Sequence, residues 1–126
     1  MIKESYCSFE VSKLLKEKGF NTPCSGRYSV RSKEFHLDCT KMCNNGGLFE
    51  CAAPTHQMAC DWVRKKGWHI SVQLSYDDDY NAVYYVTISS TKTFLAEDIG
   101  ELEDKYFSKV EDANDEALKY SLENLI

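Results

Sequence analysis

The stretch Trp68-His-Ile-Ser-Val-Gln-Leu-Ser-Tyr76 decides the fold. Its apolar and polar residues alternate, which is the pattern of a β-strand that buries one face. Turn residues follow at 77–81, and the alternation resumes with Tyr84, Val86 and Ile88. Two such runs joined by a short polar turn predict an antiparallel β-hairpin. Because one face is apolar and the other polar, we expect helices on the first and water on the second.

The first predicted helix runs from about Ser5 or Ser8 to Lys18. Its apolar residues recur at helical spacing and form one buried stripe, which comprises Cys7, Val11, Leu14 and Leu15. Gly19 follows directly, and glycine is the usual residue at the left-handed position that ends a helix. We therefore expect the helix to stop there and Cys7 to belong to the core.

Two more helices are predicted further along the chain. Pro54-Thr55 opens the second, because proline suits the first turn of a helix, and Gly67 ends it. Ser108 and Glu111 have the S-x-x-E spacing of a capping box, which predicts that the third helix begins at this serine. Its expected buried stripe comprises Val110, Ala117, Leu118, Leu122 and Leu125.

Weaker patterns occupy the rest of the chain. Residues 28–30 and 35–37 predict a short second hairpin that turns near Ser32-Lys33. Residues 96–105 allow one further short helix. The segment from about 24 to 53 is rich in cysteine, asparagine and glycine, a composition that favours turns over regular structure.

These elements predict an α+β fold with two layers, in which about three helices pack on one face of an antiparallel sheet built around the hairpin. A chain of 126 residues fits one ordinary domain, so we expect a single domain over 1–126 that includes the cysteine-rich irregular segment.

Composition limits the compartment and the partners. The first residues carry an acid where a secretory signal needs an apolar run, and no stretch reaches membrane-spanning length, so we expect a cytoplasmic protein without a membrane partner. Net charge is +4 over residues 1–70 and −9 over residues 71–126. The acidic half opposes broad phosphate binding and favours a protein partner. The sequence sets no oligomeric state.

Four cysteines in the irregular segment are candidate zinc ligands: Cys24, Cys39, Cys43 and Cys51. Zinc prefers closed tetrahedral sites of thiolate and imidazole, and His36 or His56 could replace one thiolate. The spacings C-x3-C and C-x7-C lack the tight C-x2-C knuckle of most zinc ribbons. We therefore favour free thiols without a cofactor, with a structural zinc ion as the alternative.

The sequence offers no catalytic motif. His56 and Cys60 share a helical face, but no orienting acid or oxyanion pattern accompanies them, so we interpret both as packing residues. The P-loop, dinucleotide-binding, H-E-x-x-H and G-x-S-x-G patterns do not occur in the chain. Asp77-Asp78-Asp79 lacks the glycine and distal glutamate of a calcium loop, and we expect a solvated turn. These absences indicate a protein that is not an enzyme.

A basic end of the second helix gives the main competing interpretation. Arg64, Lys65 and Lys66 lie between Trp62 and Trp68, and cations among aromatic rings are typical of single-strand nucleic-acid binding. Arg27 and Arg31 could add to such a surface. Trp62, however, belongs to the predicted buried stripe of the second helix and Trp68 to the apolar face of the strand, which leaves only a basic helix end.

Three stretches carry a resemblance: Ser5-Tyr-Cys-Ser-Phe-Glu-Val-Ser-Lys-Leu-Leu-Lys-Glu-Lys-Gly-Phe20, Ala53-Pro-Thr-His-Gln-Met-Ala-Cys-Asp-Trp-Val-Arg-Lys-Lys66 and Glu116-Ala-Leu-Lys-Tyr-Ser-Leu-Glu-Asn-Leu-Ile126. They resemble a group of small proteins encoded by gut bacteria of the Bacteroidales type and by their phages or prophages. The group has no activity to carry over, so the resemblance implies a mobile-element origin and a similar helix order. The segment from Cys24 to Cys51 departs from the group's pattern.

Together these observations predict a non-catalytic protein-interaction module. Its expected binding surface is the acidic C-terminal half or the polar face of the hairpin around Tyr85. A nucleic-acid-associated protein that uses Arg64, Lys65 and Lys66 is the alternative, and a protein with a structural zinc site at Cys24 to Cys51 is the second alternative.

Overall fold

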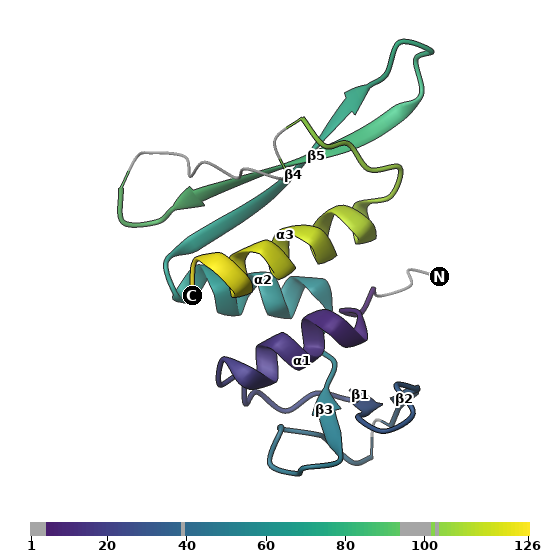
Figure 1. Cartoon of the computed structure of the whole chain (residues 1–126), viewed down its shortest axis with the longest axis vertical. Coiled ribbons are helices and arrows are strands. Elements are labelled where there is room, and N and C mark those ends of the chain that lie inside the picture. Colours follow the sequence, from purple (N-terminus) through teal and green to yellow (C-terminus); the bar gives the residue numbers. More distant parts are fainter. Residues whose placement is uncertain (1–4, 39, 94–101, 103) are drawn as a thin grey trace. The chain divides into compact units, whose positions relative to one another are not determined.

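The computed structural model describes residues 5–38, 40–93, 102 and 104–126. The chain divides into two compact units, residues 1–59 and 60–126. The described elements confirm the predicted α+β class, with three helices and an antiparallel hairpin (Figure 1). The strands form two small sheets instead of the single sheet expected. The single domain over 1–126 stays a prediction.

Helix α1 (Phe9–Glu17) has the ends that its sequence predicts. The hydroxyl of Ser8, the N-cap residue, accepts a hydrogen bond from the Val11 amide at 3.3 Å. Gly19 follows the helix with φ +95°, and the Phe20 amide donates back to the Leu15 carbonyl at 2.9 Å. This is the left-handed termination that glycine favours, and it brings Phe20 into the core.

The sheet of the first unit has the order β2-β1-β3, and both pairings are antiparallel. Strands β1 (Gly26–Ser29) and β2 (Phe35–Leu37) form the predicted short hairpin, in which Lys33 adopts a positive φ of 61°. Strand β3 (Glu50–Ala52) lies inside the segment predicted to be irregular. It pairs with β1, which lies far from it in the sequence. No local sequence pattern therefore predicts this strand.

One side chain ties that loop to the sheet. The Asn45 amide group donates to the Phe20 carbonyl at 2.7 Å and accepts from the Ala52 amide at 2.7 Å. Asn45 itself has φ 67°, a left-handed conformation that asparagine tolerates better than most residues. The Asn45 carboxamide therefore joins the cysteine-rich segment to both the end of α1 and β3, and the Lys16 ammonium adds a second link from α1 to the Glu50 carbonyl at 2.7 Å.

Helix α2 (His56–Lys65) begins after Thr55, whose hydroxyl accepts from the Met58 amide at 3.2 Å. Gly67 follows its last turn with φ +110°, as the predicted glycine termination requires. Within α2, Ala59 and Val63 are buried and lie on one face of the helix, four residues apart.

The second unit is built on strands β4 (Trp68–Tyr76) and β5 (Ala82–Ser90). They pair antiparallel over their whole length, with Trp68 opposite Ser90 and Tyr76 opposite Ala82. Helix α3 (Val110–Asn124) contacts both strands on one face (Figure 1). The unit's buried side chains include Ile70, Val86, Ile88, Leu118 and Leu122.

Two details of the second unit correct the sequence expectations. The N-cap residue of α3 is Lys109 and no side chain caps the helix, so the predicted capping box at Ser108 and Glu111 is wrong. Val110 is 37% exposed, because the stripe that packs inward begins with Ala113. The short helix allowed over 96–105 lies largely outside the described residues.

The apolar face of β4 is covered only along part of its length. Ile70 is buried, but Leu74 is 54% exposed and Tyr76 is 63% exposed. The distal half of the hairpin therefore presents large apolar side chains to solvent. None of the helices in the described part of the chain is long and apolar enough to cross a membrane.

Candidate functional site

The side of the hairpin away from α3 is the candidate site, and we call it the outer face. Alternation along each strand places eight side chains on it: His69, Ser71, Gln73, Ser75, Val83, Tyr85, Thr87 and Ser89. None of these residues is fully buried. The polar face that the sequence predicts is therefore present and accessible.

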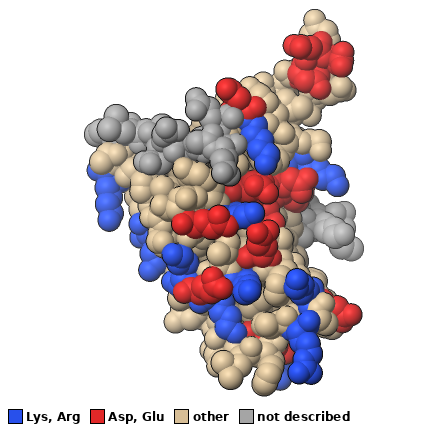
Figure 2. Space-filling view, in the orientation of Figure 1, with Lys and Arg blue, Asp and Glu red and all other residues tan. Residues whose placement is uncertain are grey.

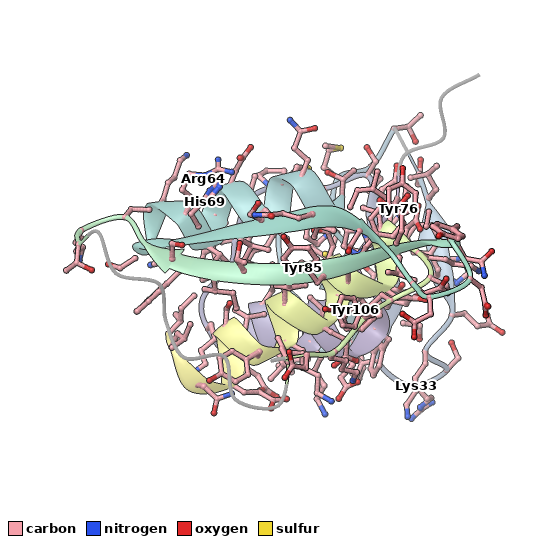
Figure 3. The ribbon with its side chains drawn as sticks, turned by 90° about the horizontal axis from the view of Figure 1, so that it is seen from above. Lys33, Arg64, His69, Tyr76, Tyr85 and Tyr106 are labelled. Carbon is pink, nitrogen blue, oxygen red and sulfur yellow. The ribbon has the colours of Figure 1, made fainter. Side chains whose placement is uncertain are left out.

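Tyr85 lies at the centre of the outer face. Its hydroxyl donates to Gln73 Oε1 on the opposite strand at 2.5 Å. Its ring meets the ring of Tyr106 edge-on, with the centroids 6.2 Å apart (Figure 3). Edge-to-face contact is a favoured arrangement of aromatic rings. The two tyrosines thus form a fixed aromatic platform, and Tyr106 remains 56% exposed.

Tyr106 reaches the outer face because the next residue joins the sheet. Phe107 forms an isolated antiparallel bridge with Tyr84 on β5, in which each amide donates to the other's carbonyl at 2.8 Å. Tyr84 belongs to the face toward α3, so its bridge partner Phe107 is buried and the neighbouring Tyr106 lies on the other side. No sequence pattern predicts that Tyr106 joins the site, since its position depends on pairing with a distant strand.

A hollow of about 290 Å³ adjoins this platform near the turn of the hairpin. Its lining residues are Ser75, Tyr76, Asp77, Asp78, Val83 and Tyr106. Two tyrosines and two aspartates among the lining residues of one hollow suit a cationic side chain, which carboxylates and aromatic rings both attract. The hollow is near the lower end of the size range of organic ligand sites.

The turn itself concentrates acid at the end of the hairpin (Figure 2). Asp77 is structural: its Oδ1 accepts from the amides of Asp79 and Asn81, both at 2.9 Å. The side chains of Asp78 and Asp79 are exposed and accept no hydrogen bond from the described residues. These two carboxylates are therefore free to meet a partner.

The basic end of α2 is largely committed to contacts within the chain. Arg64 donates to Asp61 at 2.6 Å and to His69 Nδ1 at 3.1 Å (Figure 3). The Lys66 ammonium lies 5.0 Å from the centre of the Trp62 ring. This lysine covers the surface on which a base would stack, so the geometry does not favour the nucleic-acid alternative.

The other cations proposed for that alternative lie in the first unit. Arg27 is buried, with its guanidinium 3.2 Å from Asp38 and 3.6 Å from Glu50. An arginine held between two carboxylates is already neutralised. Arg31 is exposed, next to the turn of the small hairpin.

Three of the four zinc candidates are described, and all three are buried free thiols: Cys24, Cys43 and Cys51. Cys24 and Cys43 face each other in an isolated bridge, with both amide-to-carbonyl distances 2.8 Å. Burial, and then the neighbouring Cys43, raise the pKa of the Cys24 thiol to about 11. Burial also raises the pKa of Cys51.

These thiols are not arranged as a preformed zinc site. In a tetrahedral site with Zn–S bonds of about 2.3 Å, the sulfur atoms lie about 3.8 Å apart. The sulfur atoms of Cys24, Cys43 and Cys51 do not form a group within 4.8 Å of one another. Cys39 lies outside the described residues. The zinc site therefore stays a prediction.

Cys60 does not have the environment of a nucleophile. Burial raises the pKa of its thiol to about 11, although the nearby Arg64 opposes the shift. Reactive cysteines have lowered pKa values, because the thiolate is the nucleophile. The Cys60 sulfur lies 3.9 Å from Asn114 Oδ1. This geometry agrees with the interpretation of Cys60 as a packing residue.

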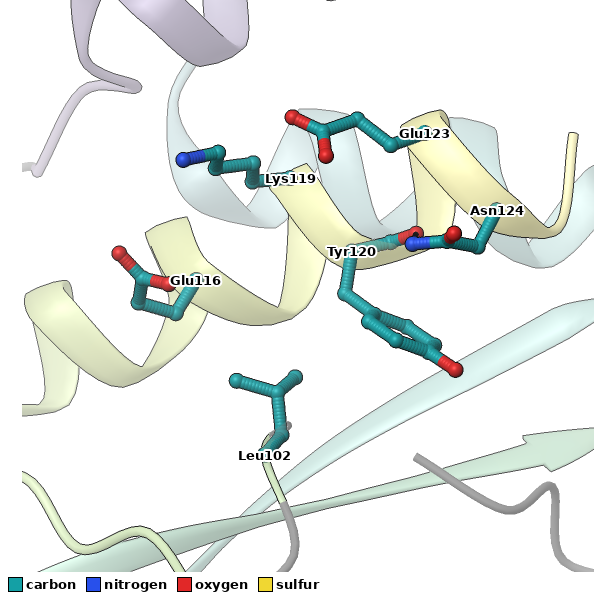
Figure 4. A pocket seen from close by; sticks show the side chains of 6 residues that line it. All are labelled: Leu102, Glu116, Lys119, Tyr120, Glu123 and Asn124. Carbon is teal, nitrogen blue, oxygen red and sulfur yellow. Dashed lines mark hydrogen bonds between the residues drawn. The ribbon is translucent and has the colours of Figure 1, made fainter. Parts of the chain in front are cut away.

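A second hollow lies along α3 and holds about 90 Å³ (Figure 4). Its lining side chains are Leu102, Glu116, Lys119, Tyr120, Glu123 and Asn124. This volume is below the size of sites that enclose organic ligands. The hollow beside the outer face, near the turn of the hairpin, is the better candidate.

Comparison of the chain with protein-family models, with curated proteins and with solved structures finds no match. The resemblance to proteins of Bacteroidales-type bacteria and their phages, and the mobile-element origin that it implies, therefore stay predictions.

Proposed function

We propose that the chain is a non-catalytic protein-interaction module that binds a basic segment of a partner protein on the outer face of the β4–β5 hairpin. The observation that supports this most is the hollow between Tyr76 and Tyr106, which two aspartates also line. A lysine or arginine side chain fits that combination of charge and aromatic surface.

The surroundings of the hollow supply the rest of a binding surface. The Tyr85–Tyr106 pair offers a rigid aromatic area beside the hollow, and tyrosine is enriched at protein interfaces. The neighbouring serine and threonine side chains of the outer face can donate and accept hydrogen bonds. A basic residue anchored in the hollow would thus lie next to an apolar contact and a polar rim, as in ordinary protein interfaces.

The thiols and histidines support a role without catalysis. The raised pKa values of Cys24 and Cys60 hold these thiols in their unreactive protonated form at neutral pH. His69, the one histidine of the outer face, is bonded to Arg64. The outer face therefore offers recognition groups and no activated nucleophile.

A selection from a peptide display library tests the proposal. Peptides retained by the purified chain should carry an arginine or lysine next to an apolar residue. Affinity, measured by fluorescence anisotropy, should fall about tenfold in Asp78→Asn and in Tyr106→Ala, which is the size of effect expected for an interface anchor.

Asp112→Asn is the matched control, because it removes the same charge at an exposed position in the first turn of α3. Its affinity should equal that of the wild type. Retained peptides without a cation, or equal losses in Asp78→Asn and Asp112→Asn, would contradict the proposed function.

A further inference from the structure

The outer edge of β4 carries backbone groups that pair with nothing in the described residues. Tyr84 directs its amide and carbonyl toward Phe107 and therefore away from β4. Leu74 is opposite Tyr84 in the ladder, so its own amide and carbonyl point away from β5. By the period of two, the same holds for five residues of β4: Trp68, Ile70, Val72, Leu74 and Tyr76.

This edge lacks the features that usually prevent strands from pairing between molecules. Between Gly67 and Asp77 the strand contains no proline and no lysine, arginine or acid. It pairs with β5 in continuous register, without a bulge. Long, uncharged edge strands of this kind are templates for a further strand. Leu74 and Tyr76 also expose apolar side chains beside the edge.

The charges at the two ends of β4 show which strand fits. Lys65, at the end of α2, and Lys66 lie before the strand with Gly67 between them and Trp68, and Asp77, Asp78 and Asp79 immediately follow the strand. An antiparallel copy of β4 would place its acidic end beside the basic end of the first, and the same contact would occur twice across a two-fold axis. A strand from an unrelated protein has no such built-in match. The edge is therefore complementary to itself in charge.

The pattern of side chains agrees with this symmetric pairing. With the axis at Val72, the middle residue of β4, Ile70 lies opposite Leu74 of the second copy and Trp68 lies opposite its Tyr76. All these residues belong to the same face of the sheet. The exposed Leu74 and Tyr76 would each gain an apolar neighbour, and the polar residues would meet polar residues on the outer face.

We propose that two copies of this chain pair antiparallel along β4, with the two-fold axis at Val72, and form a continuous four-stranded sheet. The dimer uses the edge of the hairpin, whereas the proposed function uses its outer face, so the inference does not rest on that function. Tyr76 and Asp78 border both surfaces, and the oligomeric state is therefore measured on the chain alone.

A pair of charge-reversed variants tests the contact between the two ends. Asp78→Lys/Asp79→Lys would place lysines against Lys65 and Lys66, and Lys65→Glu/Lys66→Glu would place glutamates against the aspartates. In sedimentation equilibrium each variant alone should dimerise about tenfold or more weakly than the wild type, whereas an equimolar mixture should recover a heterodimer. Circular dichroism and thermal unfolding of each variant establish that it folds.

A second experiment locates the contact. Leu74→Lys should give a monomer, because the lysine would lie against the apolar Ile70 of the second copy, whereas Gln73→Lys would meet a serine on the solvent-exposed outer face and should remain dimeric. In hydrogen exchange of the wild-type chain, the Val72 and Leu74 amides should be protected only at concentrations where the dimer forms. The Ser71 and Gln73 amides, which face β5, should be protected throughout.

Four results would overturn the inference. The first is that the wild-type chain stays monomeric at millimolar concentration, even if it then binds an added strand peptide. The second is that Leu74→Lys leaves the dimer intact. The third is that the Val72 and Leu74 amides exchange as fast at high protein concentration as they do in the monomer. The fourth is that the two charge variants each fold but do not associate when mixed.

Discussion

Gln73 and Tyr85 face each other across the hairpin, and the tyrosine hydroxyl donates to the glutamine side chain at 2.5 Å. Their neighbours on each strand, Val72 and Val86, belong to the opposite face of the sheet. Adjacent residues of β4 thus place their side chains in different surroundings, one in solvent and the next on the face covered by α3.

Val72→Asp should therefore be much more damaging than Gln73→Asp. The first variant places a carboxylate on the apolar face toward α3 and should lower the free energy of unfolding by about 2 kcal/mol or more. The second loses one exposed hydrogen bond and should cost about 1 kcal/mol or less. Urea denaturation measures both values, and equal losses would contradict the one-sided packing of the hairpin.

Ser8→Ala should destabilise the first unit by about 1 kcal/mol, because the Ser8 hydroxyl accepts the Val11 amide at the start of α1. Ser108→Ala is the matched control. Ser108 precedes α3 but provides no cap, so its replacement should leave the denaturation midpoint unchanged. A larger effect at Ser108 than at Ser8 would reverse this assignment of the caps.

Gly19→Ala should cost about 1 kcal/mol, because Gly19 has φ +95° and a Cβ disfavours that conformation. Gly47→Ala controls for the loss of a glycine as such. Gly47 does not have a positive φ, and an added Cβ there meets no atom within 4 Å. Thermal unfolding of the two variants compares them, and equal midpoints would count against strain at Gly19.

The thiol of Cys60 should react slowly at neutral pH. Burial raises its pKa from an ordinary value of 9.0 to about 11, so the folded chain holds the protonated form where an unfolded chain would ionise. The free energy of unfolding is therefore unaffected by this thiol below about pH 9. It falls as the pH rises from about 9 to about 11, because the unfolded chain ionises its thiol more readily than the folded chain.

The rate of Cys60 modification by a disulfide reagent, followed by mass spectrometry of the labelled peptide, checks this expectation. The rate should rise about tenfold for each pH unit up to the thiol's pKa, because only the thiolate attacks. A rate that levels off near pH 9, the ordinary pKa of a thiol, would mean that burial does not shield this thiol from ionisation.

Local patterns were sufficient for the elements whose ends are chemically marked. Ser8 and Gly19 define α1, Gly67 ends α2, and strict alternation defines the hairpin of β4 and β5. In each of these the determining groups lie within a few residues of one another. The polar face around Tyr85 was predicted for the same reason.

Features that depend on distant pairing could not be predicted in this way. Strand β3 exists because Arg27 to Ser29 pair with it, and Tyr106 joins the outer face because Phe107 pairs with Tyr84. Ser108 matched a capping box in spacing, but the helix begins one residue too late for its hydroxyl to serve as the cap. Spacing alone does not fix the backbone conformation that a cap requires.

The two hydrogen bonds of the Asn45 side chain bear on how the protein ages. Asn45 is followed by Gly46, and asparagine before glycine is the dipeptide most prone to deamidation. Loss of its amide nitrogen would replace the donor that meets the Phe20 carbonyl with a negatively charged oxygen, turning an attraction into a repulsion. A slow chemical change at this one position would thus remove one of the contacts between the cysteine-rich loop and the end of α1, and leave Lys16, whose ammonium donates to the Glu50 carbonyl at 2.7 Å, to hold the loop there.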